Sequence, residues 1–132
     1  MFINRFEVDI DPKHIYSDDE LETIISNSHQ FRARMLGGHA LCELNFSSTD
    51  KSLDRILKSD IQNSVGTVWN LKVSNGKFIV WIRAISRNDN AYLHMGRATV
   101  RLITERDSDG RIIPEKTKII AFDIQYGKEA TT

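Results

Sequence analysis

Residues 65–85 read VGTVWNLKVSNGKFIVWIRAI, and this stretch decides the fold class. Apolar and polar side chains alternate through residues 65–73, which is the period of a half-buried β-strand. Asn75 and Gly76 follow at once, and a two-residue hairpin turn needs a positive φ at both of its central residues. Residues 77–85 then carry apolar side chains on both alternating faces. The pattern predicts an antiparallel hairpin whose second strand lies in the middle of a barrel or sandwich.

Further strands and one or two helices are expected around this hairpin. Ser17 and Glu20 have the spacing of a capping box, which predicts a helix from Ser17 to about His29. The apolar spacing after Ser52 suggests a short helical turn over residues 53–57. Alternation predicts strands over four other ranges: 2–10, 39–45, 97–105 and 117–126. The expected fold class is therefore α+β, a small and mainly antiparallel β-barrel with one or two short helices.

Length and composition are those of an ordinary globular protein. The chain has 132 residues, of which 40% are hydrophobic and 27% are charged. We expect one domain over residues 1–132, with a short flexible tail from about 127. No apolar run approaches the roughly 18 residues of a membrane span, and no signal peptide is visible, so a membrane is not an expected partner. The single cysteine, Cys42, cannot form an internal disulfide, which favours a reducing compartment.

Charge is balanced in total but uneven along the chain. Residues 1–60 hold 7 basic and 11 acidic side chains, a net charge of −4, and residues 61–132 hold 11 basic and 7 acidic, a net charge of +4. The simplest interpretation is two solvated faces of one domain, and head-to-tail contact between copies is left open. A dedicated nucleic-acid binder usually carries a clear positive excess, so nucleic acid is not an expected partner. Trp69 and Trp81 are interpreted as core partners across the hairpin rather than base-stacking platforms.

Isolated motifs for catalysis or cofactor binding are weak. None of the four histidines forms a metal-ligand spacing, and Gly37-Gly38 lacks the lysine of a phosphate loop, so neither a metal nor a cofactor is expected. Cys42 lies on an apolar strand face and is interpreted as a small hydrophobic residue rather than a nucleophile. The hydroxyl-rich loop at residues 47–49 is interpreted as turn chemistry.

The order of motifs from residue 38 to residue 123 is more informative than any one of them. Residues 40–46 read ALCELNF and resemble the Leu-Gly-Glu-Leu-Asn-His-Pro segment of the prohead core proteases of tailed phages, which share the herpesvirus assemblin fold. A strand–hairpin–strand unit follows here as in that family, then residues 93–98 (LHMGRA) at the place of its nucleophile segment. The turn at Asp109-Gly110 and the closing AFDI at residues 121–124 also resemble the family.

The resemblance implies a protease fold without its chemistry. The family's catalytic histidine falls on Phe46, and its nucleophile falls on Met95 or Gly96. Where a supporting acid or second histidine would be expected, the chain reads Gln62-Asn63-Ser64. A serine protease needs a nucleophile and a base within hydrogen-bond reach, and neither Phe46 nor Met95 can serve. These two side chains are expected to fill the former site with apolar volume.

Three functions follow as hypotheses. The first is a non-enzymatic phage virion protein, a minor capsid or decoration protein that is assembled in the host cytoplasm and binds the major capsid protein, with self-association left open. The second is an active maturation serine protease with a rearranged site, in which His94 is the base and Ser47 or Ser48 is the nucleophile. The third is an unrelated β-barrel module for protein or nucleic acid, whose contacts would be four arginines: Arg83, Arg87, Arg97 and Arg101.

Overall fold

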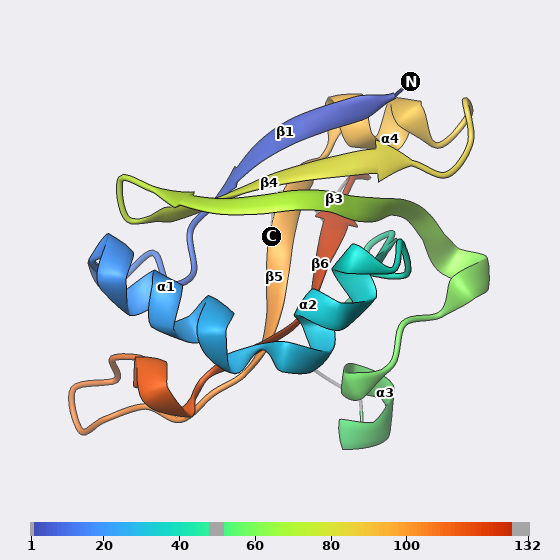
Figure 1. The fold of residues 1–132 in the computed structure, drawn as a ribbon. Helices are drawn as coiled ribbons and strands as arrows, with labels where there is room; N and C mark the ends of the chain where they lie inside the picture. The colour runs from blue at the N-terminus through green and yellow to red at the C-terminus, as the bar shows by residue number, and fades with distance from the viewer. Residues whose placement is uncertain (1, 48–51, 128–132) are drawn as a thin grey trace.

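The computed structural model describes residues 2–47 and 52–127, and Figure 1 shows how the elements follow one another. The strands are β1 (Ile3–Val8), β2 (Leu41–Glu43), β3 (Ser64–Ser74), β4 (Lys77–Ala84), β5 (Arg97–Ile103) and β6 (Lys118–Gln125). The helices are α1 (Asp18–Asn27), α2 (His29–Leu36), α3 (Leu53–Leu57) and α4 (Asn90–Met95), with 3₁₀ turns η1 (Ile61–Asn63) and η2 (Pro114–Lys116).

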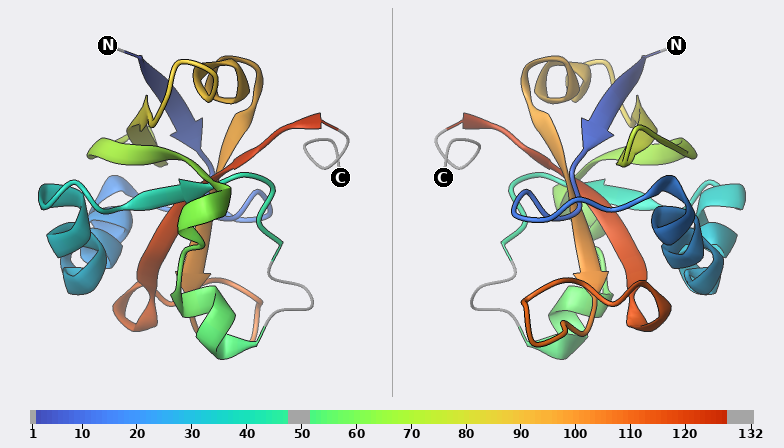
Figure 2. Two further views of the ribbon diagram at one scale, coloured as in Figure 1. Left: turned by 90° about the vertical axis from the view of Figure 1, so that its right-hand side faces the viewer. Right: turned by 90° about the vertical axis from the view of Figure 1, so that its left-hand side faces the viewer.

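The strands form two antiparallel sheets. Four strands pair in the order β1-β4-β3-β2, and β5 pairs with β6. The β5–β6 hairpin lies behind the larger sheet and runs across the direction of β3 and β4 (Figures 1 and 2). One parallel bridge, between Leu44 and Ile124, joins the two sheets at the end of β2. The α+β class and the antiparallel pairing are confirmed, whereas in the described residues no ladder joins β1 to β5 to close the predicted barrel.

The central hairpin forms as predicted, except at one residue. Asn75 and Gly76 have φ of 53° and 72°, the left-handed pair that this turn requires. A β-bulge then sets Trp69 and Asn70 together opposite Trp81. Because the bulge breaks the alternation, the core face of β3 passes from Val68 to Leu71, and Trp69 is 56% exposed. The prediction that the two tryptophans are core partners is therefore wrong.

Helices were underestimated in number, because two of the four in the described residues are very short or weakly patterned. The predicted first helix is confirmed as α1, with both hydrogen bonds of the capping box between Ser17 and Glu20. The helical turn at α3 is also confirmed. Two helices were not predicted: α2, which begins one residue after Ser28, and α4. The Ser28 hydroxyl joins this corner to β6, since it donates to Ile24 O and accepts from Ile119 N.

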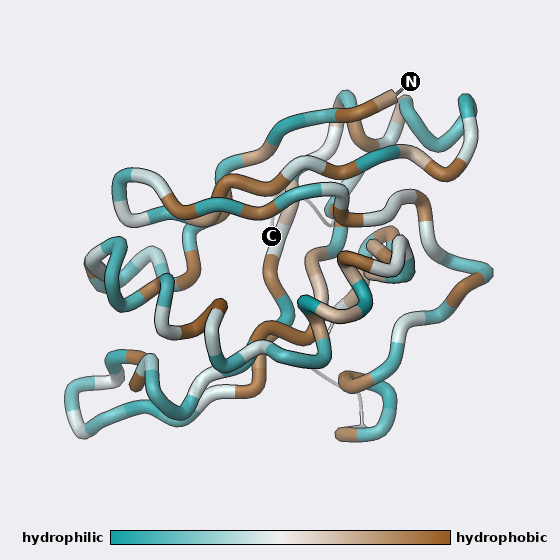
Figure 3. Tube along the Cα trace, in the orientation of Figure 1, coloured by the Kyte–Doolittle hydropathy of each residue, from teal (hydrophilic) through white to brown (hydrophobic). Residues whose placement is uncertain are grey.

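The core lies between the two sheets and is covered on its open side by α1 and α2. Figure 3 shows apolar and polar residues interspersed along β3, whereas most of β4 is apolar. Phe122 of β6 makes edge-to-face contacts with Phe31 of α2 and Phe78 of β4, with ring centroids 5.7 and 6.0 Å apart. Cys42 is fully buried in the same cluster, and burial raises the pKa of its thiol. It is a packing residue, as the sequence predicts.

A close backbone approach at Gly96 fixes the start of β5. A Cβ atom there would lie 2.6 Å from Tyr92 O and 2.7 Å from Gln125 O, and neither backbone oxygen can move aside cheaply. We therefore expect Gly96→Ala to lower the free energy of unfolding by about 2–3 kcal/mol in urea titrations. Gly37→Ala is the control, because its Cβ would meet the His39 ring at 3.3 Å and should cost under about 1 kcal/mol. Equal losses would contradict the close-approach explanation.

An ion pair between Glu20 and Arg111 predicts acid sensitivity. Hydrogen bonds from Arg111, both 2.8 Å long, and from the Ser17 backbone lower the pKa of Glu20 from 4.5 to about 2. The folded state therefore favours the ionised carboxylate, and this stabilisation is present above pH 4.5 and is lost as the pH falls towards 2. Glu20→Gln keeps an oxygen for the capping box but removes the charge.

The expected result is a stability difference between wild type and Glu20→Gln that shrinks as the pH falls through this window, measured by urea unfolding at a series of pH values. Exposed Glu22 on the same helix takes no part in the ion pair with Arg111, and Glu22→Gln is the control variant that removes one carboxylate without touching the pair. A Glu20→Gln difference that does not depend on pH would show that the ion pair contributes nothing.

Candidate functional site

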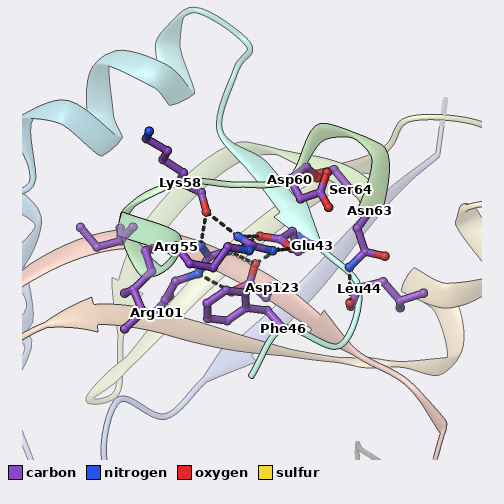
Figure 4. Close-up of polar contacts among 12 residues, drawn as sticks. Glu43, Leu44, Phe46, Arg55, Lys58, Asp60, Asn63, Ser64, Arg101 and Asp123 are labelled. Atoms are coloured by element: carbon purple, nitrogen blue, oxygen red, sulfur yellow. Dashed lines mark hydrogen bonds and ion pairs between the residues drawn. The ribbon is translucent and has the colours of Figure 1, made fainter. Parts of the chain in front are cut away.

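Four charged side chains, three of them buried, meet beside the Leu44–Ile124 bridge. We call them the Arg101 cluster: Glu43 of β2, Arg55 of α3, Arg101 of β5 and Asp123 of β6 (Figure 4). Glu43, Arg101 and Asp123 are only 0%, 4% and 2% exposed. In the sequence, each of these three charged residues has an apolar residue directly before it and directly after it. That pattern of one charge within an apolar stretch is the signal that could have predicted the cluster. The third hypothesis named Arg101 as one of four arginines that contact protein or nucleic acid, and its burial shows that part of the prediction to be wrong.

Arg101 uses its whole guanidinium group. Nε donates to Asp123 Oδ2 at 3.0 Å, and one terminal nitrogen donates to Asp123 Oδ1 at 2.7 Å and to Glu43 Oε2 at 3.2 Å. The other terminal nitrogen donates to the backbone carbonyls of Ile56 and Lys58 at 3.0 and 2.9 Å. All five N–H groups therefore have an acceptor, the condition under which a buried guanidinium is tolerated.

Glu43 is the second centre of the cluster. Its carboxylate accepts hydrogen bonds from both terminal nitrogens of Arg55, and the bond to Oε2 is 3.0 Å long. Its backbone N–H donates to Asp123 Oδ1 at 3.0 Å. Burial alone would raise the pKa of Glu43, but hydrogen bonds and charge from Arg55, with the charge of Arg101, leave it lowered. At Asp123 burial outweighs Arg101, and the pKa is raised.

Phe46 covers the cluster from the loop that follows β2. Its ring centroid lies 3.7 Å from the guanidinium carbon of Arg101 and 5.1 Å from that of Arg55. The negative face of an aromatic ring attracts such cations, and more strongly where water is excluded. In Figure 4 the ring lies against Arg101 and Asp123. The arrangement holds charges in place and offers no nucleophile, since its donors and acceptors already bind one another.

The loop that carries Phe46 is fixed to the end of β6. Asn45 adopts a left-handed φ of 55°, its N–H donates to Ile124 O at 2.7 Å, and its side-chain oxygen accepts from Tyr126 N at 2.7 Å. The Phe46 carbonyl accepts from the Gln125 side chain at 2.9 Å. Asn63 joins from η1, since its side chain donates to Leu44 O at 2.9 Å. The segments of Phe46 and Asn63 are thus brought together.

The segment of Met95 reaches the same end of β6, but its side chain does not fill a core. Met95 ends α4, and two residues later Arg97 pairs with Gln125. Leu93, two residues before Met95, is 1% exposed and faces the core, so the helix turns Met95 to solvent, where it is 69% exposed. The prediction that Phe46 and Met95 together fill the site with apolar volume is wrong. Met95 is exposed, and Phe46 lies on the guanidinium groups of Arg101 and Arg55.

Two members of the alternative catalytic set, His94 and Ser47, lie on the surface. His94 is exposed in the last turn of α4, and Ser47 is exposed after Phe46. Ser48 lies outside the described residues. Within residues 2–47 and 52–127, no group of three histidine, cysteine or acidic side chains could hold a metal ion. No helix in that part of the chain is long and apolar enough to cross a membrane.

The comparisons with known proteins found similarity in structure but not in sequence. No family model matches the sequence, and no curated protein matches it. The structure is similar to that of the bacteriophage T4 capsid assembly protease, gp21, with a TM-score of 0.60 and 16% sequence identity. The match covers 85% of this chain and 71% of the protease chain. The two proteins share a fold. At this identity the likeness extends to the prohead-protease fold and no further.

The buried cluster predicts a large loss of stability when its cation is removed. Arg101→Met should lower the free energy of unfolding by about 3–5 kcal/mol, because Glu43 and Asp123 would keep their burial and lose a partner. Urea unfolding measures the loss, and Lys118→Met at an exposed site of β6 is the control. The double variant Arg101→Met with Asp123→Leu should lose less than the sum of its single changes. Additive losses would contradict the coupling.

Proposed function

We propose that the chain is a non-enzymatic component of a phage capsid, a minor capsid or decoration protein that uses a protease-like fold to bind the major capsid protein. The fold it shares with the T4 capsid assembly protease supports a phage-assembly setting. On this proposal the protein resides in the virion after assembly in the host cytoplasm, and self-association stays open.

The observation that carries the proposal is the position of Phe46. The family resemblance puts the catalytic histidine there, and a general base needs a ring nitrogen that can accept a proton. A phenyl ring has none, and this one lies 3.7 Å from the guanidinium of Arg101. An imidazole at the same place would meet two fixed cations, which disfavour its protonated form. An aromatic face gains attraction from those cations, so the site favours a structural ring over a base.

An exposed apolar surface next to the cluster suits contact with another protein. Leu53, Leu57 and Ile61 lie on α3 and η1, and they are 61%, 42% and 76% exposed. The carbonyls of Ile56 and Lys58 accept from Arg101, so the buried cluster holds α3 against β5. Three large apolar side chains on a rigidly held segment form a contact surface of the kind that protein partners cover. We assign this surface to the capsid contact.

The test is co-expression of the chain with the major capsid protein of its phage, followed by sedimentation of the assembled particles. The chain should sediment with the particles, and Leu53→Ser with Ile61→Ser should reduce its apparent affinity for them by about tenfold or more, because apolar burial is lost. Leu36→Ser is the matched control, because Leu36 is 83% exposed at the end of α2. Absence of the chain from purified virions would contradict the capsid role.

A phosphonate probe distinguishes the inert protein from a rearranged protease. We expect no serine to be labelled and no cleavage of co-expressed capsid protein, because Phe46 and Met95 supply neither base nor hydroxyl. Labelling or cleavage that disappears in His94→Ala and in either Ser47→Ala or Ser48→Ala would overturn the non-enzymatic assignment and favour the active alternative.

A further inference from the structure

The solvent face of the β1–β4–β3 sheet carries both tryptophans of the chain. Trp81 lies near its centre, with Arg5 opposite it on β1 and with Trp69 and Asn70 opposite it on β3. Side chains of directly paired residues lie on the same face of a sheet, so Arg5 belongs to this face. No helix lies in front of β3 and β4 in Figure 1. Arg5, Trp69, Lys72 and Arg83 are exposed, Trp81 and Lys77 are partly buried, and Ile79 on the same face is buried.

Cations surround the two rings. Lys72 lies over Trp81, with its ammonium nitrogen 5.9 Å from the ring centroid. Arg83 lies two residues after Trp81 on β4, and Lys77 lies four residues before it. Both are therefore on the same face of the strand as Trp81, with Lys77 at its margin. The register places Glu7 among these cations, and Asp9 and Asp18 line a hollow with Lys77 at the margin. Away from that margin, Arg5, Lys72 and Arg83 outnumber Glu7, which gives this part of the face an excess of positive charge that the neutral chain as a whole does not have.

Carboxylates in the described part of the chain do not neutralise these cations, and Lys72 contacts the Trp81 ring. Among the described residues, Arg5, Lys72, Lys77 and Arg83 form no ion pair with a carboxylate, whereas Arg101, Arg106, Arg111 and Lys116 each do. Arg83 also lines a hollow of about 350 Å³ beside Trp69, together with Thr67 and Asn70 from the sheet and Met35 and Leu36 from α2. An exposed ring at the rim of a hollow, with a free guanidinium beside it, can hold a flat group and an adjacent anion.

We propose that this face, defined by Trp69, Trp81, Arg5, Lys72, Lys77 and Arg83, binds single-stranded nucleic acid. Bases would stack on the tryptophans while the cations contact the phosphates, the combination by which sheet surfaces hold single strands without sequence preference. An acidic peptide would satisfy the cations but would leave the two aromatic faces unused. The proposal is independent of the capsid contact, which uses α3 and η1 on another part of the molecule.

The two tryptophans also report binding directly. A titration with oligo-dT of about 16 nucleotides should quench the tryptophan fluorescence of the intact protein, and the quenching should saturate. If about three phosphates are contacted, raising the salt from about 50 to 200 mM should weaken binding by about 20-fold. Absence of quenching at low salt would overturn the proposal.

Three variants locate the site. Trp69→Ala changes an exposed ring, so it should fold normally, and it should weaken binding by about fivefold or more through lost stacking. Arg83→Gln should weaken binding and reduce the salt dependence by the contribution of one phosphate. Lys118→Gln is the charge-matched control at an exposed position of β6 and should bind like wild type.

Competition identifies the class of ligand. Poly-glutamate should displace the oligonucleotide poorly, because it offers charge without aromatic bases. Displacement by poly-glutamate at equal charge concentration, with Trp69→Ala binding like wild type, would overturn the nucleic-acid assignment and point to an acidic protein partner. Equal weakening by Lys118→Gln and Arg83→Gln would show nonspecific attraction to the whole surface and would also overturn it.

Discussion

A single buried guanidinium holds together parts of the chain that are far apart in sequence. Arg101 joins β5 to β6 through Asp123, to β2 through Glu43, and to α3 through two backbone carbonyls. Two antiparallel sheets joined by a single bridge at Leu44 would otherwise share mostly apolar contacts, which have no direction. Charged hydrogen bonds have direction, so the cluster defines how the sheets and α3 lie against one another.

The same constraint places the residue that the family resemblance aligns with a catalytic histidine. The loop after β2 is fixed at Asn45 to the end of β6, so its next side chain is delivered onto the cluster. A phenyl ring there shields the charges from water and is attracted to the cations beneath it. The fold of a capsid protease is thus compatible with a site whose side chains bind one another rather than a substrate.

Local sequence patterns predicted much of the architecture. The Asn75-Gly76 turn, the strands on either side and the capping box at Ser17 follow from the conformational preferences of a few adjacent residues, and the structure contains all of them. The bulge at Trp69 could not be foreseen, because it depends on how β3 meets β4 and not on the alternation within β3. Helices as short as α4 are stabilised by packing rather than by their own sequence, so the sequence pattern did not predict them.

The site divides in the same way. The sequence alone determined which residues stand where the family resemblance puts a base and a nucleophile, and neither Phe46 nor Met95 has the chemistry for those roles. Only the tertiary structure decided the surroundings of these two side chains: Phe46 lies on Arg101 while Met95 faces solvent. It also brought Glu43, Arg101 and Asp123 together from three strands. Which strands lie side by side depends on how the whole core packs, and the periodicity within one strand carries no information about that packing.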